Sequence, residues 1–197
     1  MTELEELIAA GRKHGARRQL ILLQAARLFA ERGYDATGID DIGAAAGVSG
    51  PAVYRHFAGK QAILTALKDL CLERLCEATR EALDVPDREP EQMLEALVDR
   101  FLDCTLRNRD LTVIMYARLT ELSEQEQQRF VEQVVELQER WKEALLRVRP
   151  GLSELDAMIT VTTALAMPSS VFLARLAGDL DAARARLRTQ ILAVLDA

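Results

Sequence analysis

The sequence has few of the residues from which most catalytic and metal sites are built. Its 197 residues include two histidines, three cysteines and one tryptophan, and aromatic residues make up 5% of the chain. The cysteines, at 71, 76 and 104, form no CxxC pair, so neither a disulfide framework nor a zinc cluster is expected. No glycine-rich phosphate loop is present. These absences predict a protein that is not an enzyme and has no cofactor or metal.

Signals for export or membrane insertion are also lacking. The first residues are acidic and then basic, with no apolar segment behind them, so no secretory signal is expected. Residues 157–174 are uncharged, close to the shortest length that spans a bilayer, but they include threonines, serines and Pro168. We therefore expect a buried helix here rather than a membrane span. Three cysteines without a pairing pattern fit reduced thiols in a cytoplasmic protein.

Positive charge is scarce overall, because the formal net charge is −6. It is concentrated, however, near the N-terminus. Residues 12–60 hold eight basic and four acidic side chains, a local charge of +4, whereas residues 61–197 hold 17 basic and 24 acidic ones, or −7. Such polarity along the chain is compatible with a nucleic-acid-binding segment near the N-terminus.

Apolar residues recur at intervals of three and four throughout, which is the helical period, and no strand pattern appears. We expect an all-α fold of about nine helices. The first ends at Gly33, the second has Thr37 as N-cap and ends at Gly47, and the third opens at Ser49 and runs to about Phe57. The others are expected at 60–83, 91–107, 110–121, 124–148, 154–176 and 180–195. Three short helices with only residues 47–49 between the last two are the layout of a helix-turn-helix.

Residues 37–60 resemble the DNA-binding motif of the tetracycline-repressor (TetR) family. Ten positions agree with the family at fixed spacing: Thr37, Ile42, Ala46, Gly47, Val48, Ser49, Tyr54, His56, Phe57 and Lys60. The resemblance covers residues 14–70 and implies a helix-turn-helix DNA-binding domain at 14–60. It further implies a connecting helix at 60–83 and a ligand-binding and dimerisation domain at 61–197. One departure is Gly43, where the family usually has alanine. A second is the acidic pair Asp40 and Asp41, near the expected DNA face.

Side chains in this segment suit DNA. Hydroxyl, imidazole and ammonium groups of Tyr54, His56 and Lys60 can reach phosphate oxygens, and Thr37 and Ser49 can serve phosphates through hydroxyl and backbone N–H groups. Arg17 and Arg18 are candidates for backbone or minor-groove contact. By family resemblance, the positions nearest base edges are Gly50, Pro51, Ala52 and Arg55. Only Arg55 among these can bind guanine with two hydrogen bonds.

The C-terminal two-thirds carries a weaker pattern. Apolar, sulfur and hydroxyl side chains on its helix faces suit either a core or a mostly apolar ligand pocket. The candidate ligand residues are Leu97, Phe101, Cys104, Met115, Tyr116, Trp141, Met158 and Thr162. As in the family, the helices at 154–176 and 180–195 are expected to pair with those of a second copy. The side chains expected at that contact are Ala164, Ala174, Leu176, Ala177, Ala183, Leu187, Ile191 and Val194.

The sequence thus indicates a homodimeric transcription regulator. We expect a repressor that binds a double-stranded, palindromic operator and is released by a small-molecule effector. The acidic residues leave one alternative open: a helical dimer that sequesters a hydrophobic ligand or a protein partner and whose helix-turn-helix is vestigial. The effector and the operator sequence cannot be derived from the residues.

Overall fold

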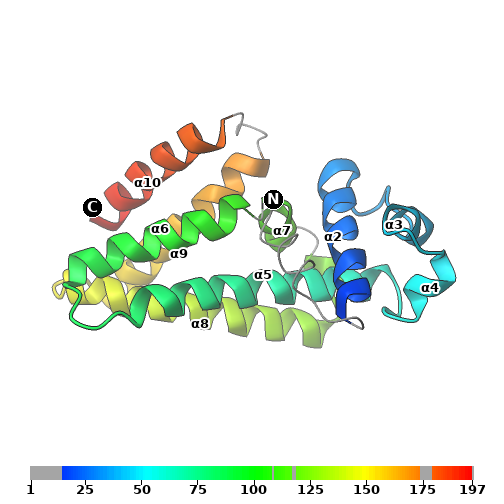
Figure 1. The fold of residues 1–197 in the computed structure, drawn as a ribbon. Helices are drawn as coiled ribbons and strands as arrows, with labels where there is room; N and C mark the ends of the chain where they lie inside the picture. Colours follow the sequence, from blue (N-terminus) through cyan, green and yellow to red (C-terminus); the bar gives the residue numbers. More distant parts are fainter. Residues whose placement is uncertain (1–14, 108, 117–118, 174–178, 197) are drawn as a thin grey trace. The chain divides into compact units, whose positions relative to one another are not determined.

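The computed structural model describes residues 15–107, 109–116, 119–173 and 179–196. These residues form nine α-helices and one 3₁₀ helix and no strand, which confirms the predicted all-α fold (Figure 1). The helices are α2 (Gly15–Arg32), α3 (Ile39–Ala45), α4 (Gly50–Tyr54), α5 (Lys60–Leu83), α6 (Pro90–Arg107), α7 (Arg109–Tyr116), η1 (Leu119–Glu121), α8 (Glu124–Val148), α9 (Glu154–Leu173) and α10 (Leu180–Asp196).

The chain divides into two compact units, neither of which is one continuous stretch. Unit 1 consists of the described residues up to Cys71 together with Asp110–Gln127, and unit 2 consists of Leu72–Arg109 together with the described residues from Gln128 onward. Two helices, α5 and α8, each contribute their first part to unit 1 and the rest to unit 2.

Unit 1 is built around the inward faces of α2, α3, α4 and the start of α5. Its apolar side chains include Ile21, Ile42, Val53, Ile63 and Leu67, each fully buried. Helix α2 packs against α3, and α3 packs against α4. Burial of these side chains on a short, connected set of helices is what stabilises α3 and α4, because helices of seven and five residues are too short to be stable alone.

Unit 2 has a second core, and its fully buried side chains include Trp141, Leu97, Leu102, Leu145 and Ile191. The Phe101 ring meets the Trp141 ring edge to face, at 5.4 Å between centroids. Helix α10 packs against both α6 and α9. None of the helices in the described part of the chain has the length and apolar character needed to cross a bilayer.

Ion pairs hold α10 to α6 beside this core. The Arg184 guanidinium donates to Asp103 at 2.8 Å and to Asp99 at 3.1 Å, and the Arg188 guanidinium donates to Asp99 and Glu95, both at 2.9 Å. These four bonds lie along adjacent turns of the two helices. We call them the α6–α10 ladder.

Several predicted helix bounds are confirmed. Helices α5 and α8 begin and end where the sequence predicts, and the Ser123–Glu126 capping box at the start of α8 is present. The N-cap of α3 was predicted wrongly by one residue. Gly38 is the N-cap, and its N–H donates to the Asp41 carboxylate at 2.8 Å. The helix predicted at 110–121 is α7, which ends at Tyr116, followed after residues 117–118 by η1.

Candidate nucleic-acid interface

The turn between α3 and α4 is tight because two glycines permit it. Gly47 has φ +65°, a left-handed conformation that other residues adopt only with strain. Gly43 is buried against the turn: a β-carbon there would lie 2.9 Å from the Val48 carbonyl oxygen and 3.3 Å from the Gly50 nitrogen. The glycine at 43, where the family usually has alanine, therefore allows α3 to approach the turn backbone closely.

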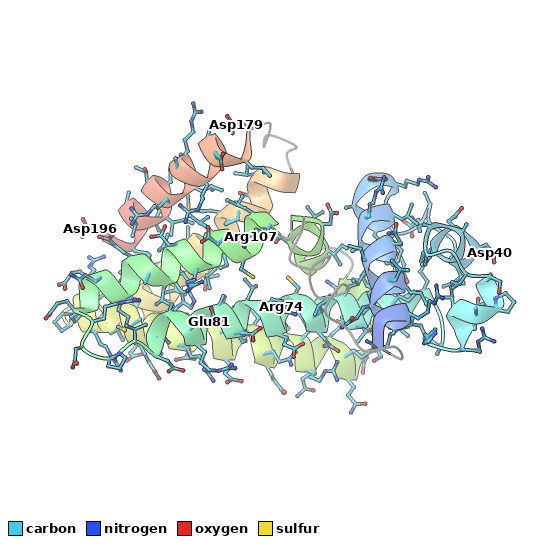
Figure 2. The ribbon with its side chains drawn as sticks, in the orientation of Figure 1. Asp40, Arg74, Glu81, Arg107, Asp179 and Asp196 are labelled. Atoms are coloured by element: carbon cyan, nitrogen blue, oxygen red, sulfur yellow. The ribbon has the colours of Figure 1, made fainter. Side chains whose placement is uncertain are left out.

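Helix α4 begins after Ser49, whose extended backbone makes it the N-cap although its hydroxyl forms no cap hydrogen bond. Pro51 lies in the first turn, where a missing N–H costs nothing. The Asp40 carboxylate packs against Gly50, at the place a β-carbon of Gly50 would occupy. Figure 2 shows Asp40 between α3 and α4. The Asp40 side chain thus packs at the junction of α3 and α4.

One side of α4 is buried and the other is open. Val53 and Phe57 are 0% and 4% exposed and anchor the helix in unit 1. Tyr54 is 57% exposed, Arg55 is also exposed, and His56 is half-buried. The hydroxyl of Tyr54, the guanidinium of Arg55 and the imidazole of His56 therefore lie at the C-terminal end of α4. The opposite side of this helix is anchored in unit 1.

Lys60 stands at the first position of α5 and is held by Tyr34. Its ammonium donates to the Tyr34 carbonyl oxygen at 2.8 Å and lies 4.3 Å from the centroid of the Tyr34 ring. The Tyr34 ring in turn packs on Phe29, 5.1 Å away. The hydrogen bond and the cation–π contact fix the position of this cation in unit 1.

Two further cations come from the first turn of α2. Arg17 and Arg18 are both exposed, and the Arg18 guanidinium lies 4.7 Å from the centroid of the Phe57 ring. Because Phe57 lies three residues beyond the end of α4, this contact places Arg18 of α2 near the C-terminal end of that helix. The positive groups predicted from separate parts of the sequence are thereby gathered in one unit.

Three predicted contact residues do not fit a direct side-chain role. Thr37 is 1% exposed, and its hydroxyl donates to the Gly33 carbonyl oxygen at 2.8 Å and lies 3.4 Å from the Leu28 carbonyl oxygen. Gly50 and Ala52 are buried against the rest of unit 1, so they do not face base edges as predicted. One physical reason applies to all three residues. In so small a unit, the residues next to a turn have to pack into the core.

Comparisons with known proteins bear on the same segment. Residues 21–67 match the family described as bacterial regulatory proteins of the tetR family. The transcriptional activator FasR of Mycolicibacterium smegmatis is 37% identical over 87 residues, which are 44% of this chain and 39% of that protein. Residues 21–67, which contain the helix-turn-helix, are therefore of the tetR type. The proteins matched over this segment are transcription regulators.

Solved structures extend the likeness to the whole fold. A TetR-family regulator from Bordetella parapertussis is 27% identical with a TM-score of 0.77, over 89% of this chain and 93% of that one. The TetR-family regulator PfmR of Thermus thermophilus is also 27% identical with a TM-score of 0.77, over 90% and 95%. The helical C-terminal part of the chain, for which the sequence indicated only the number and order of helices, therefore has the same fold as in these TetR-family regulators.

The predicted ligand residues differ in their burial. Leu97, Phe101 and Trp141 are buried in unit 2, where the two rings are in contact, whereas Cys104 and Met158 are half-buried. Thr162 does not fit a pocket, because it is exposed and accepts a hydrogen bond from Gln138 at 3.2 Å on the surface. The side chains of Met115 and Tyr116 lie outside the described residues.

A cleft of about 230 Å³ is present in unit 2, between the end of α5 and α6, near Glu81 in Figure 2. Its lining residues are Glu81, Ala82, Val85, Arg88, Ala96, Asp99, Arg100 and Asp103. None of the predicted ligand residues is among them. The charges around it are paired within the protein, since Asp99 and Asp103 bind Arg184, and Glu81 lies 3.7 Å from Arg100. The predicted apolar ligand site therefore remains a prediction.

Three of the predicted dimer contacts are wrong, because they are buried within the single chain. Ala164, Leu187 and Ile191 are at most 3% exposed within the single chain, so a second copy cannot reach them. Ala183 and Val194 are half-buried, and Ala174, Leu176 and Ala177 lie outside the described residues.

Sequence reasoning missed two polar groups on α5. Lys68 is 1% exposed, and its ammonium donates to the Ile114 carbonyl oxygen of α7 at 2.9 Å. Burial lowers the pKa of Lys68 from 10.5 to about 8.

Thr65 donates to the Glu126 carboxylate at 2.9 Å. Hydrogen bonds from Ser123, followed by that from Thr65, lower the pKa of Glu126 from 4.5 to about 2. The Ser123–Glu126 spacing indicated the helix cap. Nothing in the sequence indicated that Glu126 also accepts a hydrogen bond from Thr65 of α5.

Proposed function

We propose that this TetR-like chain binds double-stranded DNA in the cytoplasm as a homodimer and regulates transcription. The observation that carries the proposal is the open end of α4, where exposed Tyr54 and Arg55 stand on a helix anchored by Val53 and Phe57. An α-helix presented in this way fits the major groove of B-DNA, which is about 12 Å wide.

The residues have separate roles in this proposal. Arg55 is the base-reading candidate, because its guanidinium can donate two hydrogen bonds to guanine. Tyr54, His56, Ser49 and Lys60 bind phosphate oxygens. Pro51 is exposed at the start of α4 and lies against the groove. Arg17 and Arg18 bind the DNA backbone or the minor groove. Thr37, Gly50 and Ala52 take no side-chain part, since they are buried.

The test is selection of a binding sequence from a random duplex pool, followed by affinity measurements at several salt concentrations. Tyr54→Ala and Lys60→Ala should weaken binding of the selected duplex, and Lys60→Ala should reduce the slope of log affinity against log salt by about one. Arg27→Ala is the matched control, because the Arg27 guanidinium is exposed on α2 and is engaged by Glu31 at 2.8 Å. A wild-type chain that binds no duplex even at low salt would instead support the sequestering alternative.

We place the dimer contact on the exposed faces of α9 and α10. Between residues 157 and 173, α9 has no charged side chain, and Leu155 and Ile159 near its start are 69% and 56% exposed. The exposed positions that form these faces are Leu155, Ile159, Thr162, Thr163, Ala166 and Ser170 of α9, with Ala182, Ala185, Thr189 and Ala193 of α10. Uncharged and small side chains allow close helix packing with a symmetry-related copy. Two copies of α4 about 34–36 Å apart would meet successive major grooves of a palindromic operator.

Sedimentation of a matched pair of variants tests this contact. Ile159→Glu should convert the dimer to a monomer, because it places a charge in an apolar contact. Val85→Glu should remain dimeric, because Val85 is 41% exposed but lies in the segment between α5 and α6 and not on α9 or α10. A dimeric Ile159→Glu protein would exclude α9 as the dimer contact.

We further propose that the protein is a repressor and that a small, mostly apolar effector in unit 2 releases it from the operator. The support is the apolar interior of unit 2 and the family fold, whereas the 37% identical relative is named an activator. Transcription in vitro from a promoter carrying the selected duplex distinguishes the two, since a repressor lowers transcript yield and an activator raises it. Operator affinity measured against a panel of apolar compounds then tests release, which an affinity unchanged by every compound would contradict.

A further inference from the structure

The first turn of α4 has no polar side chain of its own to offer a base pair. Gly50 and Ala52 are buried, and the exposed Pro51 has no hydrogen-bonding group in its side chain. In a helix-turn-helix, the N-terminal residues of the second helix are the ones that contact base edges. A hydrogen bond to a base at this end of α4 therefore has to come from a neighbouring element.

The Asp40 side chain of α3 supplies a polar group at this place. One of its carboxylate oxygens lies where a β-carbon of Gly50 would be, so glycine at position 50 leaves room for it. Asp40 is exposed and stands at the junction of α3 and α4 (Figure 2). Within the part of the chain that the structure describes, no hydrogen bond or ion pair engages this carboxylate. A group that can accept hydrogen bonds is thus presented at the start of α4.

The neighbouring Asp41 is engaged differently, although both residues belong to the first turn of α3. The Asp41 carboxylate accepts a hydrogen bond from the Gly38 N–H at 2.8 Å and so caps its own helix. Capping therefore accounts for Asp41. It does not account for Asp40, whose carboxylate lies against the next helix.

The chemistry of a carboxylate restricts what it can bind on DNA. An ionised carboxylate only accepts hydrogen bonds, and phosphate oxygens repel it. The major groove exposes two amino groups, N4 of cytosine and N6 of adenine. Adenine carries the acceptor N7 beside its amino group, which would repel the second carboxylate oxygen, whereas cytosine presents no acceptor of its own in this groove. Cytosine is therefore the base that fits a carboxylate best.

We propose that the Asp40 carboxylate accepts a hydrogen bond from cytosine N4, at the operator base pair that faces the N-terminal end of α4. The inference rests on the proposed DNA-binding function and adds to Arg55 a second base-contacting residue, of opposite charge. Asp40 also selects by repulsion, because a duplex without an amino group at this position presents only acceptors to the carboxylate.

The first experiment is selection from a random duplex pool with the wild type, Asp40→Asn and Asp41→Asn. The wild type should select cytosine at one position of each half-site. Asp40→Asn should select adenine there, because an asparagine amide binds adenine N6 and N7. Asp41→Asn removes the same charge one residue away and should select the wild-type sequence. The proposal is overturned if Asp40→Asn keeps the wild-type base, or if Asp41→Asn changes the same position.

The second experiment compares two duplexes that differ only in C·G or T·A at the selected position. The wild type should bind the C·G duplex about fivefold or more tightly, and Asp40→Ala should bind the two about equally. A side chain that merely positioned α4 would, on removal, weaken both duplexes alike and leave the ratio of their affinities unchanged. An unchanged ratio would thus exclude contact between Asp40 and the base.

Gly50→Ala tests the position of the carboxylate while Asp40 is still present. The new β-carbon takes the place of the carboxylate oxygen, and the aspartate side chain can rotate away, so we expect this variant to fold. With the carboxylate displaced, the ratio of the two affinities should fall towards one. Gly59→Ala, whose β-carbon meets nothing within 4 Å, should keep the wild-type ratio. Equal ratios in these two variants would contradict the proposed position.

These outcomes separate the inference from the function beneath it. A wild-type chain that selects no duplex contradicts the proposed function itself. A wild-type chain that selects a duplex, with Asp40→Asn and Asp41→Asn selecting the same sequence as the wild type, contradicts only the assignment of Asp40. If Gly50→Ala does not fold, the selection by Asp40→Asn decides the matter, since Asp40 is exposed and asparagine has nearly the same shape.

Discussion

Gly43 and Val48 face each other across the turn between α3 and α4, so closely that a β-carbon on Gly43 would lie 2.9 Å from the Val48 carbonyl oxygen. Real β-carbons do not approach a backbone oxygen to that distance, and the oxygen belongs to a turn that cannot easily move. Glycine at position 43 has a low helix propensity, but it allows α3 to pack closely against the turn.

Gly43→Ala should destabilise the protein in spite of alanine's better helix propensity. The gain from propensity is about 1 kcal/mol, whereas overpacking against backbone costs about 1–3 kcal/mol, so we expect a net loss of about 1 kcal/mol in the free energy of unfolding. Urea unfolding followed by circular dichroism measures it. Gly59→Ala is the control, because a β-carbon there meets nothing within 4 Å. Equal stability of the two variants would show that α3 can retreat from the turn.

Lys68 should make stability depend on alkaline pH. Its pKa is lowered to about 8 in the folded state, so between pH 8 and about 10.5 the unfolded chain binds the extra proton and stability rises with pH. The free energy of unfolding of the wild type minus that of Lys68→Met should increase by up to about 3 kcal/mol over this range. The same subtraction for Lys142→Met, a lysine paired with Glu139 and Glu154, should show no such rise.

Glu126 should act in the opposite pH range. Its pKa is lowered to about 2 by hydrogen bonds from Ser123 and Thr65, so its contribution is complete above the ordinary value of 4.5 and is lost as the pH falls towards 2. The stability advantage of the wild type over Glu126→Gln should therefore shrink between pH 5 and pH 2. Glu124→Gln, in the same turn of α8, serves as the reference. An advantage that stays constant over this range would mean that the carboxylate charge is not what the cap and α5 bind.

The α6–α10 ladder should be sensitive to salt. Arg188 binds both Asp99 and Glu95, so Arg188→Met should lower the free energy of unfolding by about 1 kcal/mol at low ionic strength and by less in 1 M sodium chloride. Arg186→Met is the control, because Arg186 is exposed on the same helix. A loss that is the same at both salt concentrations would point to packing of the arginine stem instead of charge.

The sequence predicted helix bounds best where the stop and start signals were strong. Prolines follow α5, and a capping box opens α8, so both helices were placed correctly. At α3 the sequence indicated Thr37 as the N-cap, because threonine is a residue type that caps helices. The Thr37 hydroxyl finds the Gly33 carbonyl instead, and the cap passes to Gly38. A local pattern does not reveal such a competing partner.

Helix faces were harder to predict where polarity gives no contrast. Helix α9 is uncharged over almost its whole length, so its sequence does not separate the side that packs inside the chain from the side left exposed. Ala164 was therefore placed at the dimer contact although it is buried, and Thr162 was placed in a pocket although it is exposed. Arg17, Arg18 and Arg55 are exposed, as charged side chains are expected to be, and their contact with DNA stays a prediction.

The pairing of Lys60 with Tyr34 has a consequence for the energetics of encounter with DNA. A lysine ammonium has three N–H donors, and the Tyr34 carbonyl takes one of them, which leaves donors for a phosphate oxygen. The flexible four-carbon chain is already immobilised in the free protein. The rotamer freedom that a surface lysine would lose on binding DNA has therefore already been lost during folding, so in the proposed complex a phosphate oxygen would meet a preorganised ammonium group.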